Sequence, residues 1–204
     1  MSHGIPVVVL GGSGYVAGEV VRLLAAHPGF ALAAVVSESR VGGLVEEAFP
    51  HLAGTVDGLA FAAAASLAEV FASIAAGGRR CALVSAAPHG ASAALVARTL
   101  ELAATAGVEL SVVDLSADFR FAEAGEYAAV YGHPHPAPEL LARFVRALPE
   151  HAGPKAAAER ALFVAHPGCF TTSVLLAIVP LLAGGLAAPS FAVTAITGST
   201  GRCL

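Results

Sequence analysis

The chain has 204 residues, of which 56% are apolar and 13% are charged, and its formal net charge is −4. A mean hydropathy of +0.75 excludes intrinsic disorder, which requires low hydrophobicity and high net charge. The mildly acidic balance lacks a basic face beyond the pair Arg79 and Arg80, so we expect no nucleic-acid partner. The length allows one domain, or one domain and part of a second.

Cysteine usage indicates the compartment. The three cysteines, Cys81, Cys169 and Cys203, are odd in number, which fits a reducing environment better than a disulfide framework. The first apolar run, 5–10, has no basic leader and continues directly into glycines, so it does not resemble a secretory signal. We therefore predict a cytoplasmic protein.

Alternating strands and helices are predicted over the first half of the chain, because short β-branched runs alternate with stretches of helical spacing. In chain order they are strand 5–10, helix 15–27, strand 30–36, helix 66–76, strand 81–87, helix 91–106 and strand 108–115. This alternation predicts an α/β fold with a parallel, doubly wound sheet. The irregular region 121–160 predicts surface loop and a helix around 138–148.

The stretch 161–201 contains no Asp, Glu, Lys or Arg, which raises the question of a membrane span. A spanning helix needs about 20 consecutive apolar residues, and here proline, glycine and Thr171-Thr172-Ser173 interrupt the run. We expect a buried helix, with its regular part at 173–182, followed by a buried strand, and no membrane partner.

A glycine-rich turn lies between the first strand and the first helix. Glycines there allow backbone N–H groups and the helix N-terminus to approach a pyrophosphate. The alternative is an ordinary strand-to-helix turn. The predicted dinucleotide-binding residues of this turn are Gly11, Gly12, Ser13, Gly14, Tyr15 and Val16.

The end of the second strand bears on the choice of dinucleotide, since a carboxylate there binds a ribose 2′-hydroxyl and an arginine accepts a 2′-phosphate. The sequence is Ser37-Glu38-Ser39-Arg40, which contains both kinds of residue. Ser37, Ser39 and Arg40 favour NADP slightly.

Cys169 is the candidate nucleophile. It follows the turn His166-Pro167-Gly168 and precedes a predicted helix. N–H groups at a helix N-terminus stabilise a thiolate. The alternative is a small buried core residue.

A series of motifs in order resembles the N-acetyl-γ-glutamyl-phosphate reductase family of the semialdehyde dehydrogenase superfamily. The motifs are Gly11-Gly-Ser-Gly-Tyr-Val-Ala-Gly-Glu19, Phe49-Pro-His-Leu52, Pro88-His-Gly90, Val113-Asp-Leu-Ser-Ala-Asp-Phe-Arg120, Tyr131-Gly132, Ala137-Pro-Glu-Leu140, Leu148-Pro-Glu150 and His166-Pro-Gly-Cys169. The resemblance implies a Rossmann-type domain followed by an α+β catalytic domain. It also implies NADPH-dependent reduction of an acyl phosphate, a small-molecule substrate, to an aldehyde through a thioester on Cys169.

The resemblance suggests further roles and leaves alternatives. Arg120 is the local candidate for binding the phosphate, or else an ion-pair partner of Asp118. Asp114 and Asp118 are expected to order the loop. His133 and His135 have a metal-binding spacing without a third ligand, so no metal is expected.

Several positions depart from the family pattern. His166 stands where asparagine is usual, Phe170 where tyrosine is usual, and Arg146-Ala147 where Tyr-Gly is commoner. These departures leave an aminoadipyl or aspartyl phosphate reductase as an alternative. Neither His89 nor His166 matches the family's acid/base histidine, so no base is assigned.

The resemblance also predicts the domain organisation. We expect an NADP-binding domain at 1–160 and the beginning of a catalytic domain at 161–204. Family members continue past the turn that Gly198–Arg202 resembles, so we expect a C-terminally truncated chain whose full-length form is a homo-oligomer. The remaining alternative is a nucleotide-binding module without catalysis.

Overall fold

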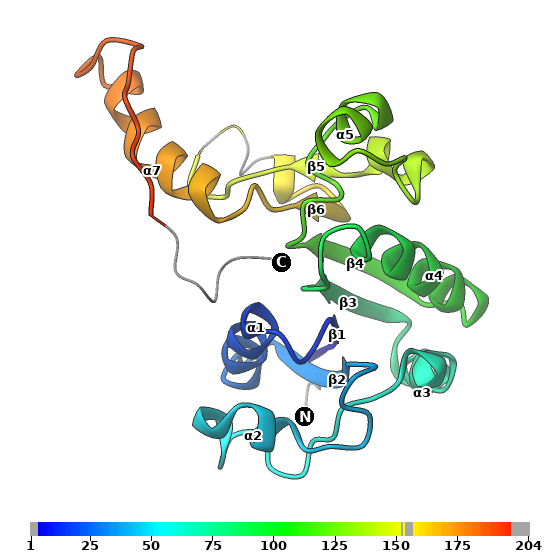
Figure 1. Cartoon of the computed structure of the whole chain (residues 1–204). Helices are drawn as coiled ribbons and strands as arrows, with labels where there is room; N and C mark the ends of the chain where they lie inside the picture. Colours follow the sequence, from blue (N-terminus) through cyan, green and yellow to red (C-terminus); the bar gives the residue numbers. More distant parts are fainter. Residues whose placement is uncertain (1–3, 152, 154–156, 197–204) are drawn as a thin grey trace.

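A computed structural model describes residues 4–151, 153 and 157–196 (Figure 1). The predicted turn at 198–202 and Cys203 lie outside the described residues. The fold is α/β, as predicted, and is built on one sheet of six parallel strands. In spatial order these are β2 (Phe30–Val36), β1 (Ile5–Leu10), β3 (Arg80–Ser85), β4 (Glu109–Asp114), β6 (Phe163–Ala165) and β5 (Val145–Arg146).

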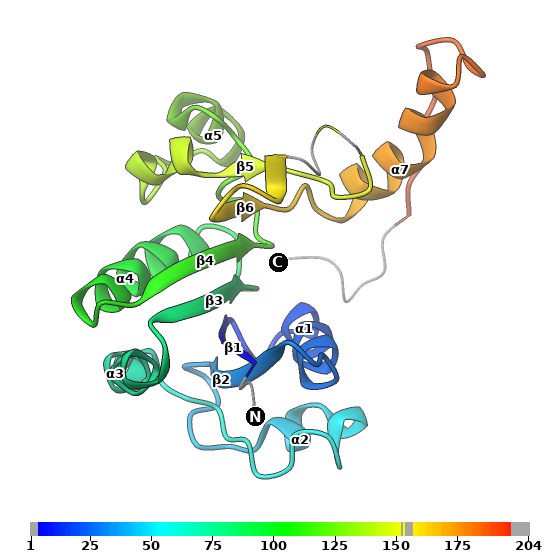
Figure 2. The ribbon, with the colours of Figure 1, turned by 180° about the vertical axis from the view of Figure 1, so that it is seen from behind.

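Helices cover both faces of the sheet, as expected for a doubly wound fold (Figures 1 and 2). The helices are α1 (Tyr15–Ala25), α2 (Val45–Ala48), α3 (Leu67–Gly77), α4 (Ser92–Thr105), α5 (Ala124–Tyr131) and α7 (Cys169–Ala183), with 3-10 turns η1 (Pro50–Leu52), η2 (Ala64–Ser66) and η3 (Pro138–Arg143). Val7 and Val9 of β1 pack in a core with α1, and Val8 and Leu10 pack in a core with α3 and α4. This alternation explains the uninterrupted apolar run of β1, which is buried on both faces.

The predicted helix around 138–148 is wrong. The chain forms only the 3-10 turn η3, becomes extended at Phe144, and then adds β5 to the edge of the sheet by pairing with Val164 and Ala165. The ring of Phe144 stacks on Phe119 with centroids 3.9 Å apart. Long-range strand pairing and this ring contact therefore override the local helical tendency.

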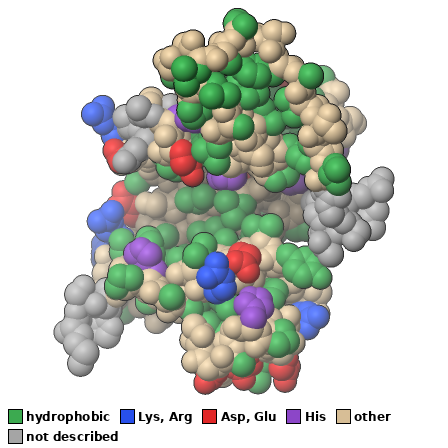
Figure 3. Space-filling view, turned by 90° about the vertical axis from the view of Figure 1, so that its left-hand side faces the viewer, with side chains coloured by type: hydrophobic (Ala, Val, Ile, Leu, Met, Phe, Trp, Pro, Cys, Tyr) green, Lys and Arg blue, Asp and Glu red, His purple; other side chains and the backbone are tan. Residues whose placement is uncertain are grey.

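The helix predicted after residue 161 is present, but its predicted burial is wrong. α7 contains the predicted regular part 173–182 and begins at Cys169, and none of its residues is buried. Residues 190–196 form no strand, and Ile196 is 91% exposed. α7 extends away from the sheet in Figure 1, and Figure 3 shows hydrophobic side chains gathered at this end of the molecule. In the described ranges, no helix is both long and apolar enough to cross a bilayer.

The sheet continues past the predicted domain boundary at residue 160. β6 pairs with β4 through Val112 and Phe163, so the turn before Cys169 is anchored directly in the parallel sheet. The division into 1–160 and 161–204 stays a prediction.

Candidate functional site

The ends of four parallel strands form one row across the sheet. Leu10 is in register with Ser85, Ser85 with Asp114, and Asp114 with Ala165. The loops that follow these residues therefore leave the same carboxyl edge, where ligands of open α/β sheets bind. Neighbouring strands are about 4.8 Å apart, so the glycine turn and the Cys169 turn are separated by roughly 14 Å along this edge.

The glycine turn leaves no room for side chains at its first two positions. Gly11 has φ +71°, and a Cβ there would lie 2.6 Å from the backbone of Ala86 and Ala87, in the loop after β3. A Cβ at Gly12 would lie 2.5 Å from Val35 Cγ1. The turn therefore packs tightly between the ends of β2 and β3, at the point where the strand order reverses.

The N-terminus of α1 is free to bind an anion. Gly14 is its N-cap and supplies no side chain, and the first helical hydrogen bond runs from Gly18 N–H to Gly14 O. The N–H groups of residues 15–17 thus have no partner within the helix. Tyr15 and Val16 are exposed. This arrangement fits a pyrophosphate, which needs close backbone approach and free N–H donors.

Three serine hydroxyls converge beside the glycine turn. Ser37 Oγ donates to Ser13 Oγ at 2.9 Å, and Ser39 Oγ lies 3.4 Å from Ser13 Oγ and 3.3 Å from Ser37 Oγ. Glu38, between these serines, accepts the N–H of Ala64 at 2.6 Å. The structure thus brings together the residues predicted from both segments, with the carboxylate engaged elsewhere. Arg40 is exposed close by in sequence.

The loops after β3 and β4 are joined by hydrogen bonds, and they include His89, to which no role was assigned from the sequence. Asp118 accepts hydrogen bonds from the N–H groups of Gly90 at 2.8 Å and Ala93 at 2.9 Å, which caps the start of α4. His89 Nδ1 accepts the N–H of Ala117 at 2.8 Å, so its neutral form carries hydrogen on Nε2. The exposed His89 therefore lies on the same sheet edge, and its sequence signal was the Pro-His-Gly turn directly after a strand.

Asp114 is completely buried at the end of β4. It accepts hydrogen bonds from Ser92 Oγ at 2.6 Å and Ser116 Oγ at 2.7 Å. Burial raises the pKa of Asp114, and these two hydrogen bonds oppose that rise. The group connects the loop after β4 to α4 and faces no open space, which agrees with a role in ordering the loop.

Cys169 is the exposed first residue of α7. The preceding Gly168 is buried with φ +94°, a conformation that L side chains rarely adopt. By contrast, Cys81 is buried in β3, and burial raises the pKa of its thiol to about 12. Of the two cysteines that the structure describes, only Cys169 is placed to react with a ligand.

Arg120 lies directly beneath the Cys169 turn. Its Nε donates to His166 O at 3.0 Å and its Nη2 donates to Leu115 O at 3.2 Å. A Cβ on Gly168 would lie 2.6 Å from Arg120 Cζ. The carboxylate of Asp118 accepts backbone N–H groups, as described above, so the alternative of an Arg120–Asp118 pair finds no support in these contacts. The predicted phosphate contact of Arg120 stays a prediction.

Both nitrogens of His135 are engaged. Nδ1 accepts the N–H of Ala137 at 3.0 Å, so Nε2 carries hydrogen and donates to Asp118 O at 2.8 Å. His133 is exposed nearby. In the portion of the chain with described coordinates, no group of three or more His, Cys, Asp or Glu could hold a metal ion.

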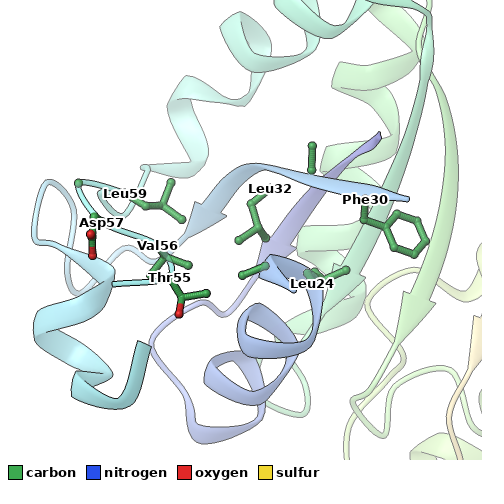
Figure 4. Close-up of a pocket in the computed structure, with 10 residues that line it drawn as sticks. Leu24, Phe30, Leu32, Thr55, Val56, Asp57 and Leu59 are labelled. Atoms are coloured by element: carbon green, nitrogen blue, oxygen red, sulfur yellow. The ribbon is translucent and has the colours of Figure 1, made fainter. Parts of the chain in front are cut away.

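A surface hollow elsewhere is unrelated to this edge. It is lined by the last turn of α1, the first residues of β2 and the loop 55–59 (Figure 4). Leu24, Leu32 and Val56 contribute its apolar wall. Since it includes the beginning of β2, it lies at the opposite edge of the sheet from the glycine turn.

Comparison with known proteins agrees with this geometry. A family model described as "Semialdehyde dehydrogenase, NAD binding domain" matches residues 6–144. N-acetyl-gamma-glutamyl-phosphate reductase of Pseudomonas putida (strain W619) is 41% identical over 186 residues, which are 91% of this chain and 49% of the relative. The reductase of Ectopseudomonas mendocina is 42% identical, over 90% of this chain and 48% of the relative.

The matches cover about nine tenths of this chain, but the chain spans only about half the length of the curated relatives that it matches. The matched family segment includes the glycine turn, the serine cluster, the capped α4 and Arg120. From this match, and from the parallel sheet and glycine turn that it covers, we conclude that the chain belongs to the semialdehyde dehydrogenase family and contains its NAD(P)-binding domain.

Proposed function

We propose that this chain is part of an NADPH-dependent reductase that converts N-acetyl-γ-glutamyl phosphate to the semialdehyde, with release of phosphate. The observation that carries the proposal is the exposed Cys169 at the start of α7, on the same sheet edge as the glycine turn. Identity of about 41% to reductases of this name, extending over nine tenths of the chain, supports the choice of substrate.

The residues supply the steps as follows. The Cys169 thiolate attacks the acyl carbon, the C–O bond to phosphate breaks, and a thioester forms while phosphate departs with the electron pair of that bond. NADPH, when bound, supplies the hydride that reduces the thioester. The thiolate of Cys169 then leaves as the aldehyde forms. The N–H groups at the start of α7 stabilise the thiolate in both its attacking and leaving roles.

Selectivity for NADPH is part of the proposal. The hydroxyls of Ser13, Ser37 and Ser39 form a cluster that can donate to a 2′-phosphate, and the exposed Arg40, which follows Ser39 in the chain, would add a positive charge. Glu38 would repel that phosphate if it faced the cluster, but its Oε1 accepts the N–H of Ala64. The second strand thus ends beside a cluster of hydroxyl donors, with the carboxylate of Glu38 bonded to Ala64 N–H, which supports NADP rather than NAD.

We expect Arg40→Ala to weaken NADPH binding about tenfold and to leave NADH binding nearly unchanged, because one charge-assisted hydrogen bond to phosphate is lost. Titration of each nucleotide by protein-induced fluorescence change measures both constants. Arg98→Ala is the matched control, since Arg98 is an exposed arginine on α4. Equal weakening of NADPH and NADH by Arg40→Ala would contradict the assignment.

Substrate panels test the reductase itself. In the full-length protein, we expect phosphate-dependent oxidation of N-acetylglutamate semialdehyde to exceed that of aspartate and aminoadipate semialdehydes by at least roughly 100-fold, the discrimination available to a site that binds the acyl group specifically. A preference for another semialdehyde would replace the proposed substrate.

A non-catalytic nucleotide-binding module is the second candidate, because the family model that matches residues 6–144 describes the NAD-binding domain alone. Measuring nucleotide binding and turnover separately on the 204-residue chain distinguishes the two. Binding without turnover in both this chain and the full-length protein would support the module. The cytoplasmic location and the homo-oligomer stay predictions.

A further inference from the structure

His166 makes three hydrogen bonds between β6 and α7. Its N–H donates to Asp114 O at 2.9 Å, and its carbonyl oxygen accepts Arg120 Nε at 3.0 Å. Its imidazole Nδ1 accepts the N–H of Gly168 at 3.2 Å. The side chain thus bridges to the residue directly before Cys169, and the backbone of His166 ties the same turn to β4 and to Arg120.

The side-chain bond requires a neutral imidazole. Nδ1 can accept a hydrogen bond only when it carries no hydrogen, so the hydrogen of neutral His166 lies on Nε2. Protonation would turn Nδ1 into a donor facing another donor, the N–H of Gly168. The bond to Gly168 therefore exists in only one protonation state of the ring.

The surroundings favour the neutral state. The charged and titratable groups around His166 are Arg120 beneath the turn, Glu150 from the segment after β5, and the Cys169 thiol at the start of α7. Partial burial lowers the pKa of His166 most, the positive charge of Arg120 lowers it further, and Glu150 opposes them. These influences together lower the pKa of His166, which favours the neutral ring that the bond to Gly168 needs.

We propose that His166 is a positioning residue: its imidazole closes the Pro167-Gly168 turn by accepting the Gly168 N–H and so holds Cys169 at the N-terminus of α7. This inference rests on the proposed function for the role of Cys169 as nucleophile. Arg120 completes the arrangement by fixing the carbonyl of His166 from below. The guanidinium leaves no space for a Cβ at Gly168, so the turn is held on both sides.

The geometry identifies an informative substitution. An asparagine Oδ1 also accepts an N–H two residues along the chain, in an Asx turn, but it does not titrate. His166→Asn therefore preserves the proposed acceptor and removes its pH dependence. His166→Leu removes the acceptor while filling similar volume.

The test measures alkylation of Cys169 by iodoacetamide in the 204-residue chain, resolved by peptide mass spectrometry. At about pH 8 we expect equal rates for the wild type and His166→Asn and a rate about fivefold lower for His166→Leu, the factor that one hydrogen bond supplies. As the pH falls to about 4.5, two units below the ordinary pKa of histidine, the wild type should lose up to about fivefold relative to His166→Asn, because its imidazole becomes charged. A constant ratio of these two rates across this range would overturn the proposal.

Cys81 supplies a control for folding, and NMR of the wild type supplies a second measurement. Cys81 is buried in β3, so its alkylation reports unfolding of a variant in the same sample. If His166→Leu fails to fold, nitrogen-15 NMR of the wild-type imidazole still gives a result: we expect hydrogen on Nε2, and hydrogen on Nδ1 would overturn the proposal. Alkylation needs neither substrate nor nucleotide, so absent reductase activity with an intact alkylation pattern would reject the proposed function alone.

Discussion

Replacing Cys169 by serine is expected to lower reductase turnover of the full-length protein by roughly 10⁴-fold or more, the scale of loss when a covalent nucleophile is removed. The serine hydroxyl keeps the size of the side chain but is not ionised near neutral pH, so it cannot use the N–H groups at the start of α7 as a thiolate does. Cys169 is exposed and packs in no core cluster, so the fold should not change. Nucleotide oxidation followed by absorbance measures the loss.

Nucleotide binding should survive this substitution, because the glycine turn follows β1 and the Cys169 turn follows β6, with two strands between them. Cys81→Ala is the matched control. It removes a buried thiol from β3 and should cost about 1 kcal/mol of stability, but it should leave turnover nearly intact. Retained turnover in Cys169→Ser would show that Cys169 is not the nucleophile.

The sequence predicted β1 to β4 because each is a short apolar run bounded by turns, and β1 is buried on both faces. Continuous apolar runs such as those of β1 and β2 have few alternative positions, and glycine ends several of the intervening helices. Prediction failed where the decisive contacts are long-range. Val145 and Arg146 form an edge strand only because β6, about twenty residues later in sequence, offers them a partner.

The exposed helix α7 shows that burial cannot be predicted from composition alone. Its apolar composition predicts burial, yet burial depends on what packs against the helix, and no residue of α7 is buried in the structure. An apolar composition indicates that a helix favours burial, but whether its side chains are buried depends on which other elements pack against it. Local turn chemistry was more informative, since Pro167 and Gly168 correctly predicted a helix starting near Cys169.

The site was predicted in its parts but not in its contacts. Ser37 and Ser39 were identified from the end of a strand, but the engagement of Glu38 by Ala64 N–H could not be deduced from spacing. Similarly, Arg120 was identified by its charge, whereas its position beneath Gly168 depends on the pairing of β4 with β6. The motifs therefore identified candidate residues, and the sheet register determines which of them lie close together.

Gly11→Ala is expected to lower the free energy of unfolding by about 3 kcal/mol and to weaken nucleotide binding at least about tenfold. Two costs combine: an alanine at φ +71°, and a Cβ 2.6 Å from the backbone of Ala86 and Ala87. Backbone atoms cannot rotate away as a side chain can, so the loops after β1 and β3 must separate. That separation would move the glycine turn away from the pyrophosphate position. Urea unfolding and nucleotide titration measure the two effects.

Gly107→Ala separates these costs. Gly107 has the same φ of +71° after α4, is exposed, and would have nothing within 4 Å of its Cβ. Its replacement should therefore cost only the backbone penalty of about 1 kcal/mol and leave nucleotide binding unchanged. Equal destabilisation by the two substitutions would mean that the close approach of the β3 loop to Gly11 does not constrain the turn. The difference between the two losses in free energy of unfolding measures how tightly the β3 loop packs against Gly11. A large difference would explain why the turn requires glycine at this position.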